Sequence, residues 1–514
     1  MKKFKQYIVG ALLLPLLLGS CTSNFEEYNT DPNRPTTLDA AALIPNLIDC
    51  LASPEENPCQ RNNTFWACFG GYVTATNSWG RQFLYATYNI DDEWNKWSAD
   101  WYFNTLYRNY FQIARLTNET GPVFSLAQML RVNIMQYVVN MQGPLPYSQV
   151  KMGTFAVPYD DEQTAYMAMF EDLDKAIAGL KSAQGILEED NTVAPYDRVY
   201  GGDYSKWLKY ANTLKLRMAI RIARVEGQEE FAHRKALEAV QEGVMSSASD
   251  TAWDKLGAWK NGFNTVQEWG EMRANASIVT FMNGYEDPRR EVYFKTTNNG
   301  TGAAYTGVRS GIAGITTADY ANASKFKVDE KTDMLIFSAA EAAFLQAEAA
   351  LLGWTDVCPS ARSFYEAGIT ISFAERGVTS NVASYYNNST RLPGNFTDMK
   401  NSACNYTPKN QVSIMWNESA SDAEKLNRVI TQKWIANFPL GAEAWNDYRR
   451  TGYPEMPVKA LAANDGILPT RLRYPADEEF RNRDNYFEAV NGWLGGTNNM
   501  TTNVWGADHT NKRK

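Results

Sequence analysis

The segment SAAEAAFLQAEAALLG, which spans residues 338–353, predicts the fold class of this chain. Alanine, leucine and glutamate have strong intrinsic helix preferences, so residues 338–352 are expected to form a helix. Gly353 follows at the position where many helices end in a left-handed conformation. The small side chains of Ala347 and Ala350 would let a second helix pack closely. The segment therefore predicts one half of a helical hairpin.

Apolar residues at helical spacing recur on both sides of this segment, behind residues that commonly begin helices. The patterns are Pro122 with Leu126, Leu130, Ile134, Tyr137 and Met141; Asp161 with Tyr166, Phe170, Leu173, Ile177 and Leu180; Asp203 with Trp207, Ala211, Leu214 and Met218; and the capping-box pair Ser421 and Glu424 before Leu426, Val429, Ile430 and Trp434. Helices joined by short loops are typical of tetratricopeptide-like pairs, although no clean repeat of about 34 residues is visible. The chain is therefore predicted to be all-α dominated.

Two segments depart from the helical pattern. Residues 250–334 carry many Gly, Asn, Thr and Ser residues with scattered aromatic side chains, and residues 377–420 are similarly polar. We expect a helical scaffold over about 37–245 and 335–455, with 250–334 as a loop-rich insertion. Because binding residues concentrate on loops that a rigid scaffold positions, ligand contacts are expected in this insertion.

The N-terminus has the three-part layout of a secretory signal peptide. It consists of a positive start (Lys2, Lys3 and Lys5), an apolar run from Ile8 to Leu18, and small residues before a cysteine in Leu18-Gly19-Ser20-Cys21. The apolar run is too short for the roughly 20 residues that span a bilayer as a helix. We expect residues 1–20 to be removed, Cys21 to carry lipid, and the Pro-broken remainder of 21–36 to act as a tether. An ordinary cleaved signal with a chance cysteine is the alternative.

Composition argues against several classes of function. The 514 residues carry 50 basic and 58 acidic side chains, and no basic patch precedes the terminal Lys512-Arg513-Lys514, so nucleic acid is a poor candidate partner. His233 and His509 are the only histidines, and no zinc-protease, serine-hydrolase, phosphate-loop or calcium-loop motif occurs. A Ser-His-Asp triad or a histidine metal site is therefore hard to build, and we expect no metal and no cofactor. A glycosidase-like carboxylate pair stays open, because Asp and Glu are plentiful.

Short motifs follow one another along the mature chain. They are FEEYNTDPN at 25–33, GPLPYS at 143–148, VPYD at 157–160, DLDKAI at 172–177, YGGD at 200–203, NTLKLR at 212–217, DPR at 287–289, YTGV at 305–308, AEAA at 347–350, QKW at 432–434 and EAWNDYRRTGYP at 443–454. Their order and spacing resemble the SusD/RagB-like family of nutrient-binding outer-membrane lipoproteins. One departure is Gly143-Pro144, where the family usually has Gly-Asp, which puts any acidic role there in doubt.

The resemblance implies tetratricopeptide-like helical pairs, few short strands and a loop-rich region that contacts ligand. It implies a non-catalytic protein, lipid-anchored in the outer membrane and facing the cell exterior, that captures nutrient, foremost an oligosaccharide. A SusC-like TonB-dependent transporter is the implied partner. A peptide or other polymer ligand is the alternative within the family. A secreted glycoside hydrolase with an Asp/Glu pair and a structural or adhesion protein are the alternatives outside it.

Aromatic residues are concentrated between Phe65 and Phe111, where 16 of 47 residues are Phe, Trp or Tyr against 13% in the whole chain. Most have helical spacing and are expected in the core: Trp94, Trp97 and Trp101, and likewise Phe103, Tyr107 and Tyr110. Trp79 fits no such stripe, because it lies in the polar segment Asn77-Ser78-Trp79-Gly80-Arg81. We predict that Trp79 stacks on a sugar ring beside hydrogen bonds from Asn77 and Arg81. Tyr85 and Tyr88 are further candidates.

A second candidate group lies in the loop-rich insertion and consists of Trp259, Asn261, Asn264 and Trp269. The resemblance implies that aromatic residues of the early segment and of this region meet across one surface site. Trp253 is closer to a predicted helix and is expected to be packed. A structural role, with the arginines paired internally, is expected for Trp434, Trp445, Tyr448, Arg449 and Arg450 and for Glu341 and Glu348.

Overall fold

The computed structural model describes residues 38–52, 67–77, 85–88, 90, 92, 95–96, 102–298, 303–312, 314–455 and 468–505. The predicted signal peptide, Cys21 and the tether lie outside these residues. So do Trp79, Arg81 and the predicted stripe of Trp94, Trp97 and Trp101.

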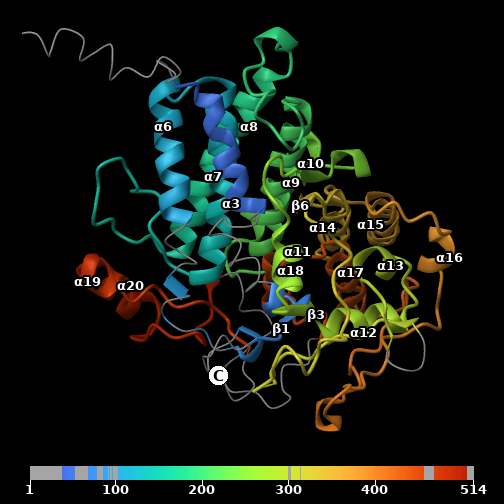
Figure 1. Cartoon of the computed structure of the whole chain (residues 1–514). Helices are drawn as coiled ribbons and strands as arrows, with labels where there is room; N and C mark the ends of the chain where they lie inside the picture. The colour runs from blue at the N-terminus through green and yellow to red at the C-terminus, as the bar shows by residue number, and fades with distance from the viewer. Residues whose placement is uncertain are drawn as a thin grey trace, which may run out of the picture.

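Helices dominate the architecture, as predicted (Figure 1). The longer ones are α3 (Ile44–Ala52), α6 (Tyr107–Thr117), α7 (Gly121–Gln142), α8 (Glu162–Ala183), α9 (Tyr204–Ile222), α10 (Glu229–Glu242), α14 (Ala339–Leu351), α15 (Ala361–Glu375), α17 (Asp422–Ala436), α18 (Gly441–Thr451) and α20 (Arg483–Trp493). Helices that follow one another along the chain pack in pairs: α6 with α7, α7 with α8, α8 with α9, α9 with α10, and α14 with α15. The predicted all-α, helical-pair fold is confirmed.

The predicted helix starts are observed in atomic detail. The side chains of Asp161, Asp203 and Ser421 each accept a hydrogen bond from a backbone N–H in the first turn of α8, α9 and α17. Pro122 lies in the first turn of α7, where its missing N–H costs nothing. Gly353 follows α14 with a φ of +84°, the left-handed conformation that the sequence predicted.

The strands are few and short. β1 (Val73–Ala75) pairs with β3 (Met272–Ala274), β2 (Ala252–Asp254) with β6 (Met334–Phe337), and β4 (Thr297–Asn298) with β5 (Ala303–Ala304), all antiparallel. The region 250–334 also contains three short helices, α11 (Gly262–Glu268), α12 (Ala276–Gly284) and α13 (Arg290–Tyr293). The polar region 377–420 contains α16 (Val382–Tyr386). Short elements therefore interrupt both regions.

A buried chain of eight alternating charges joins α9, α14, α17 and α18. In order of contact these are Glu348, Arg450, Asp447, Lys433, Glu341, Arg217, Glu443 and Arg221. No side chain in this buried ion chain is more than 5% exposed. Because four cations face four anions in turn, each charge that has left water is compensated by an opposite one.

The pKa values in the ion chain reflect this pairing. Burial by itself raises the pKa of Asp447, but Lys433 and Arg450 lower it to about 2. Burial also opposes ionisation of Glu341, yet Arg217 and Lys433 keep its pKa below the ordinary value. The stability that Asp447 contributes is thus fully present above its ordinary pKa and is lost as the pH falls toward 2.

Two hydrogen bonds and one close backbone approach at Gly70 join the segment 67–77 to α17 and α18. The Trp434 indole N–H donates to Gly70 O at 2.7 Å, and the Tyr72 hydroxyl donates to Trp434 O at 2.6 Å. A Cβ on Gly70 would lie 2.7 Å from Gly441 O, so only glycine allows this approach to α18. β1 follows directly and is therefore positioned by α17 and α18.

None of the helices among the described residues combines the length and the apolar character needed to cross a membrane.

We predict that Glu341→Ala lowers the free energy of unfolding by about 3–5 kcal/mol, because Arg217 and Lys433 would keep their charges in the interior without a shared carboxylate. Lys181→Ala is the matched control, since it breaks the exposed pair with Glu242 and should cost about 1 kcal/mol or less. Urea unfolding of both variants measures the difference. Equal losses would contradict a central role for the ion chain.

Candidate ligand-binding site

The β1–β3 ladder brings the early segment onto the loop-rich region. Beyond the ladder, the Thr76 N–H donates to Glu271 O at 2.8 Å and the Thr76 hydroxyl donates to Gly270 O at 2.7 Å. Asn77 follows, and its side-chain NH₂ donates to the Glu271 carboxylate at 2.9 Å. Asn77 and Glu271 thus form a polar pair at the meeting point of the two regions.

Trp269 lies two residues before Glu271 and is 64% exposed. It closes α11, where its N–H donates to Thr265 O at 3.1 Å. Gly270 then turns the chain with a φ of +82°, and a Cβ there would lie 2.5 Å from a Thr317 methyl carbon. A helix end and a glycine turn therefore hold a large apolar ring in solvent, two residues along the chain from Glu271. Exposed aromatic surface next to polar groups marks a candidate ligand contact.

Asn261, predicted to contact ligand, instead has its side chain buried in a helix cap. Its carboxamide oxygen accepts the N–H groups of Phe263 and Asn264 at the start of α11, and its NH₂ donates to Thr332 O at 3.0 Å. The residue is only 2% exposed. Asn261 therefore caps a helix, and its buried amide is not available to a bound molecule. The sequence pattern did not distinguish the two roles, because Asn is favoured both at caps and in sugar sites.

Trp259 precedes α11, whereas Trp269 lies at its C-terminal end. Trp259 is 36% exposed. The carbonyl oxygens of Gly257, Ala258 and Trp259 converge on the Lys331 ammonium, at 3.1, 3.4 and 2.9 Å. Lys331 thus stabilises the turn that carries Trp259 by donating hydrogen bonds to three of its carbonyl groups.

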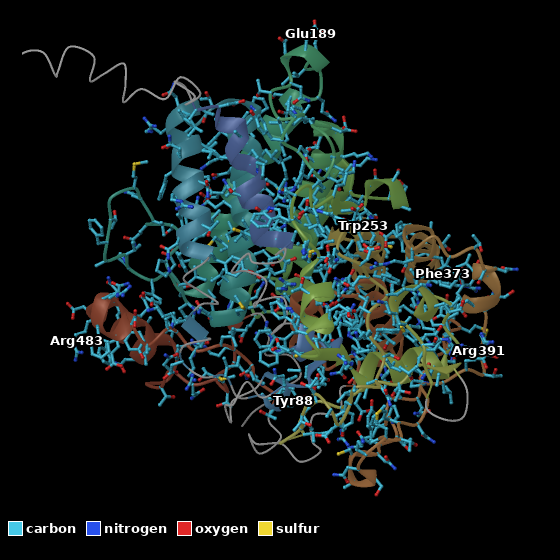
Figure 2. All side chains as sticks on the ribbon, in the orientation of Figure 1. Tyr88, Glu189, Trp253, Phe373, Arg391 and Arg483 are labelled. Atoms are coloured by element: carbon cyan, nitrogen blue, oxygen red, sulfur yellow. The ribbon has the colours of Figure 1, made fainter. Side chains whose placement is uncertain are left out.

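The sequence also singles out three further aromatic residues, Tyr88, Tyr85 and Trp253. Tyr88 is 4% exposed and packs near Phe69, with ring centroids 6.3 Å apart, so it belongs to the core. Tyr85 begins a short 3-10 turn, Tyr85–Thr87. Trp253 lies in β2 rather than in a helix and is partly buried under the Arg376 guanidinium, 5.0 Å from the ring centroid. Its expected packing is observed; Figure 2 labels its position among the side chains of the molecule.

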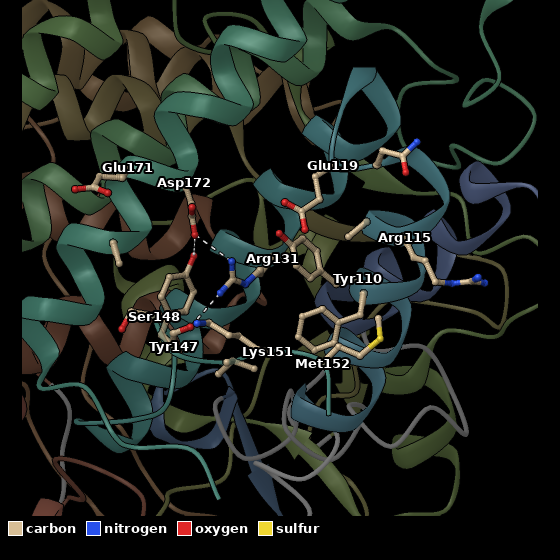
Figure 3. A pocket seen from close by; sticks show the side chains of 15 residues that line it. Tyr110, Arg115, Glu119, Arg131, Tyr147, Ser148, Lys151, Met152, Glu171 and Asp172 are labelled. Atoms are coloured by element: carbon tan, nitrogen blue, oxygen red, sulfur yellow. Dashed lines mark hydrogen bonds and ion pairs between the residues drawn. The ribbon is translucent and has the colours of Figure 1, made fainter. Parts of the chain in front are cut away.

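A hollow that the sequence did not predict lies between α6, α7, α8 and the segment 148–157 (Figure 3). Its volume is about 740 Å³, and a second chamber of about 420 Å³ adjoins it toward α19 (Glu478–Arg481). The two chambers share Phe111, Val150, Lys151 and Met152. We call both together the helical hollow.

An ordered polar cluster lies at the base of the helical hollow. The Arg131 guanidinium donates to Asp172 at 3.0 Å and to Tyr147 O at 3.1 Å, and the Tyr147 hydroxyl donates to Asp172 at 2.9 Å (Figure 3). The predicted aromatic stripe of Phe103, Tyr107 and Tyr110 is only partly core: Tyr107 and Tyr110 are buried, whereas Phe103 is partly exposed. All three side chains line the hollow. Helical spacing identifies a face but not what covers it.

We predict that Lys331→Met loosens the turn that carries Trp259, because three carbonyl groups lose their common donor. A loss of about 1 kcal/mol corresponds to roughly fivefold faster hydrogen exchange of the amides in residues 257–261. Lys260→Met is the matched control: it removes the neighbouring ammonium, which pairs with Glu330 at 3.3 Å, and should leave this exchange nearly unchanged. Equal exchange rates in Lys331→Met and the wild type would contradict a stabilising role of Lys331 in this turn.

Comparison with solved structures identifies several relatives, whereas comparison with curated protein sequences finds no match. A SusD-like protein from Bacteroides thetaiotaomicron VPI-5482 is 42% identical over 92% of this chain and 99% of its own, with a TM-score of 0.87. A SusD homologue from Bacteroides ovatus ATCC 8483 is 34% identical over 91% and 99%, with a TM-score of 0.84. A chitin-binding SusD homologue from Flavobacterium johnsoniae is 31% identical over 91% and 98%, with a TM-score of 0.85.

A family model described as SusD-like, the SusD and RagB outer membrane lipoproteins, matches residues 27–507. This match covers nearly the whole chain, including the helical pairs, the β1–β3 junction and the segment with Trp269. The chain therefore belongs to the SusD-like family of outer membrane lipoproteins.

Proposed function

We propose that this protein captures an oligosaccharide at the cell surface without catalysis and passes it to a SusC-like TonB-dependent transporter. The proposal rests on the exposed Trp269 ring, which lies two residues before Glu271 in the chain, and on the Asn77–Glu271 hydrogen bond that joins the early segment to this turn. A sugar ring has a flat C–H face and a rim of hydroxyl groups. An exposed aromatic face with an adjacent amide and carboxylate offers one partner for each.

The proposed site extends from this pair to both neighbouring segments. Trp79, Arg81 and Tyr85 follow Asn77 within eight residues, so they are close enough along the chain to contribute further stacking and hydrogen bonds. Trp259, whose backbone carbonyl accepts a hydrogen bond from Lys331, would be an additional contact for a longer glycan chain. Asn261 is not included, because it caps α11.

The N-terminal segment completes the proposed arrangement. Lipid on Cys21 would anchor the protein in the outer membrane, facing the exterior. The 15 residues from Thr22 to Thr36 would reach about 50 Å if fully extended. Such a tether would let the body move relative to the transporter while staying close to it.

A saccharide is favoured over a peptide ligand by two considerations. One solved relative is described as chitin-binding. In addition, an exposed aromatic ring with neighbouring amide and carboxylate groups is complementary to the C–H face and the hydroxyl rim of a sugar. Hydrolysis by a carboxylate pair would require turnover of a bound glycan, which we do not expect.

We predict that Trp269→Ala lowers the affinity for the cognate glycan at least tenfold, a loss of about 1.4 kcal/mol, because the stacking face is removed. The melting temperature should change little, since the ring is mostly in solvent. Calorimetric titration against a glycan panel measures the affinity. Trp493→Ala, an exposed tryptophan on α20, is the control and should bind normally. Unchanged affinity in Trp269→Ala would count against the site.

The transporter partnership predicts that affinity purification of the full lipidated chain from its own outer membrane recovers a large β-barrel protein in near-equal amount. Purification of the Cys21→Ala form is the control, and it should recover much less, because the tether no longer concentrates the two proteins on one surface. Recovery of the lipidated chain alone, under mild detergent, would contradict the partnership.

A further inference from the structure

We propose that the helical hollow is a second saccharide site, which takes an uncharged oligosaccharide on the side of the molecule formed by α6, α8 and α19. The inference rests on the proposed function, because it assumes that the protein handles glycan chains. It concerns residues that the Trp269 surface does not use.

The size of the hollow suits a ligand rather than a few water molecules. Its chambers of about 740 and 420 Å³ lie within the range of roughly 300–1,000 Å³ that is common for ligand pockets. Shared walls at Phe111, Val150, Lys151 and Met152 make the two chambers neighbours along one path. An extended chain molecule could therefore occupy both.

The charges around the larger chamber favour an uncharged ligand. Three cationic side chains, Arg115, Arg131 and Lys151, are matched by three anionic ones, Glu119, Glu171 and Asp172. Figure 3 shows Arg131 and Asp172 on one side of the chamber and Arg115 and Glu119 on the other. A ligand with net charge of either sign would gain little from this balanced lining, whereas hydroxyl groups can donate to one set and accept from the other.

The smaller chamber supplies apolar faces. Six aromatic residues line it: Phe103, Tyr107, Phe111, Phe155, Tyr159 and Tyr474. Polar groups lie among them, including the side chains of Asn104, Glu478 and Arg481. An acyl chain would desolvate these polar groups without offering partners. Alternating apolar and hydrogen-bonding surface is instead complementary to pyranose rings.

The segment that covers the hollow has a fixed base and an exposed tip. Asp160 accepts hydrogen bonds from the Tyr147 N–H, the Ser148 N–H and the Ser148 hydroxyl at 3.1, 2.6 and 2.6 Å. At the tip, Met152 is 60% exposed and Phe155 is 98% exposed, although both line the hollow. These two apolar side chains can therefore gain burial when a ligand fills the space beneath them.

The returning arm of the same segment is joined to α19. The Tyr159 hydroxyl donates to the Glu478 carboxylate at 2.8 Å, and the Asn482 side chain donates to Val157 O at 2.9 Å. The loop beside α6 and the helices α19 and α20 lie on one side of the molecule in Figure 1. The hollow is thus built by two parts of the chain that are far apart in sequence.

Two sites on one molecule would bind one glycan polymer at two points. The second contact becomes intramolecular once the first has formed, so the apparent affinity for a long chain exceeds that of either site. Short oligosaccharides would occupy the two sites independently.

The test uses the full chain in detergent and a panel of hexasaccharides of glucose, xylose and N-acetylglucosamine, titrated by calorimetry. Ala168→Trp places an indole into the larger chamber, and Ala168→Ser is its matched control. In the Trp269→Ala background, residual binding should remain, should fall at least tenfold with Ala168→Trp, and should persist with Ala168→Ser.

Ala168→Trp could also disturb the packing of α8, so a second pair of variants tests the hollow from the covering segment. Phe155→Ala should weaken the residual binding about fivefold, whereas Leu187→Ala, which alters another exposed apolar residue that does not line the hollow, should not. Complete loss of binding in Trp269→Ala alone would overturn the second site and leave the proposed function intact. Residual affinity that neither Ala168→Trp nor Phe155→Ala lowers would also overturn the second site. Absence of binding of every saccharide by the wild type, or binding of peptides alone, would contradict the proposed function and the second site together.

Discussion

The chain of eight alternating charges from Glu348 to Arg221 is the constraint on which the rest of the structure depends. Each carboxylate and each cation has left water, and an ion in that position is tolerated only with opposite charges at contact distance. Apolar packing allows helices to slide or rotate by small amounts at modest cost. Paired buried ions resist such movements, because displacing one partner leaves a buried charge without compensation. The relative positions of α9, α14, α17 and α18 are therefore narrowly defined.

A short series of contacts connects these helices to the candidate ligand surface around Trp269. Trp434 on α17 holds Gly70, the Gly70 backbone lies against α18, and β1 begins three residues later. β1 carries Asn77 to Glu271 and so meets the segment that displays Trp269. A rigid helical interior can in this way hold an exposed ring in a reproducible place while the loops around it vary.

The two candidate binding surfaces differ in how they are built. The Trp269 surface consists of a helix end, a glycine turn and an Asn–Glu pair, so its geometry comes from backbone hydrogen bonds and one hydrogen bond between side chains. The helical hollow lies between packed helices and has a loop with an exposed tip over it. The first is an open face suited to initial contact, and the second is a concave space that can enclose part of a chain. Their separation would give a captured polymer two points of attachment on one protein.

Sequence by itself determined the helical class, the helix starts at Asp161, Asp203 and Ser421, the end of α14 at Gly353, and the family. These depend on local spacing, capping and motif order, which a single chain displays directly. It also indicated a structural role for Glu348 and Arg450, because both lie in helical patterns with opposite charges nearby. Tertiary structure alone decided that Asn261 caps a helix while Trp269 stays exposed, that Tyr88 is buried, and that Lys331 holds the turn of Trp259. It alone assembled the hollow from residues 103–172 and 474–482. The physical reason is the same in each case: residue type specifies what a side chain can do, whereas exposure and partners depend on which distant segments fold against it.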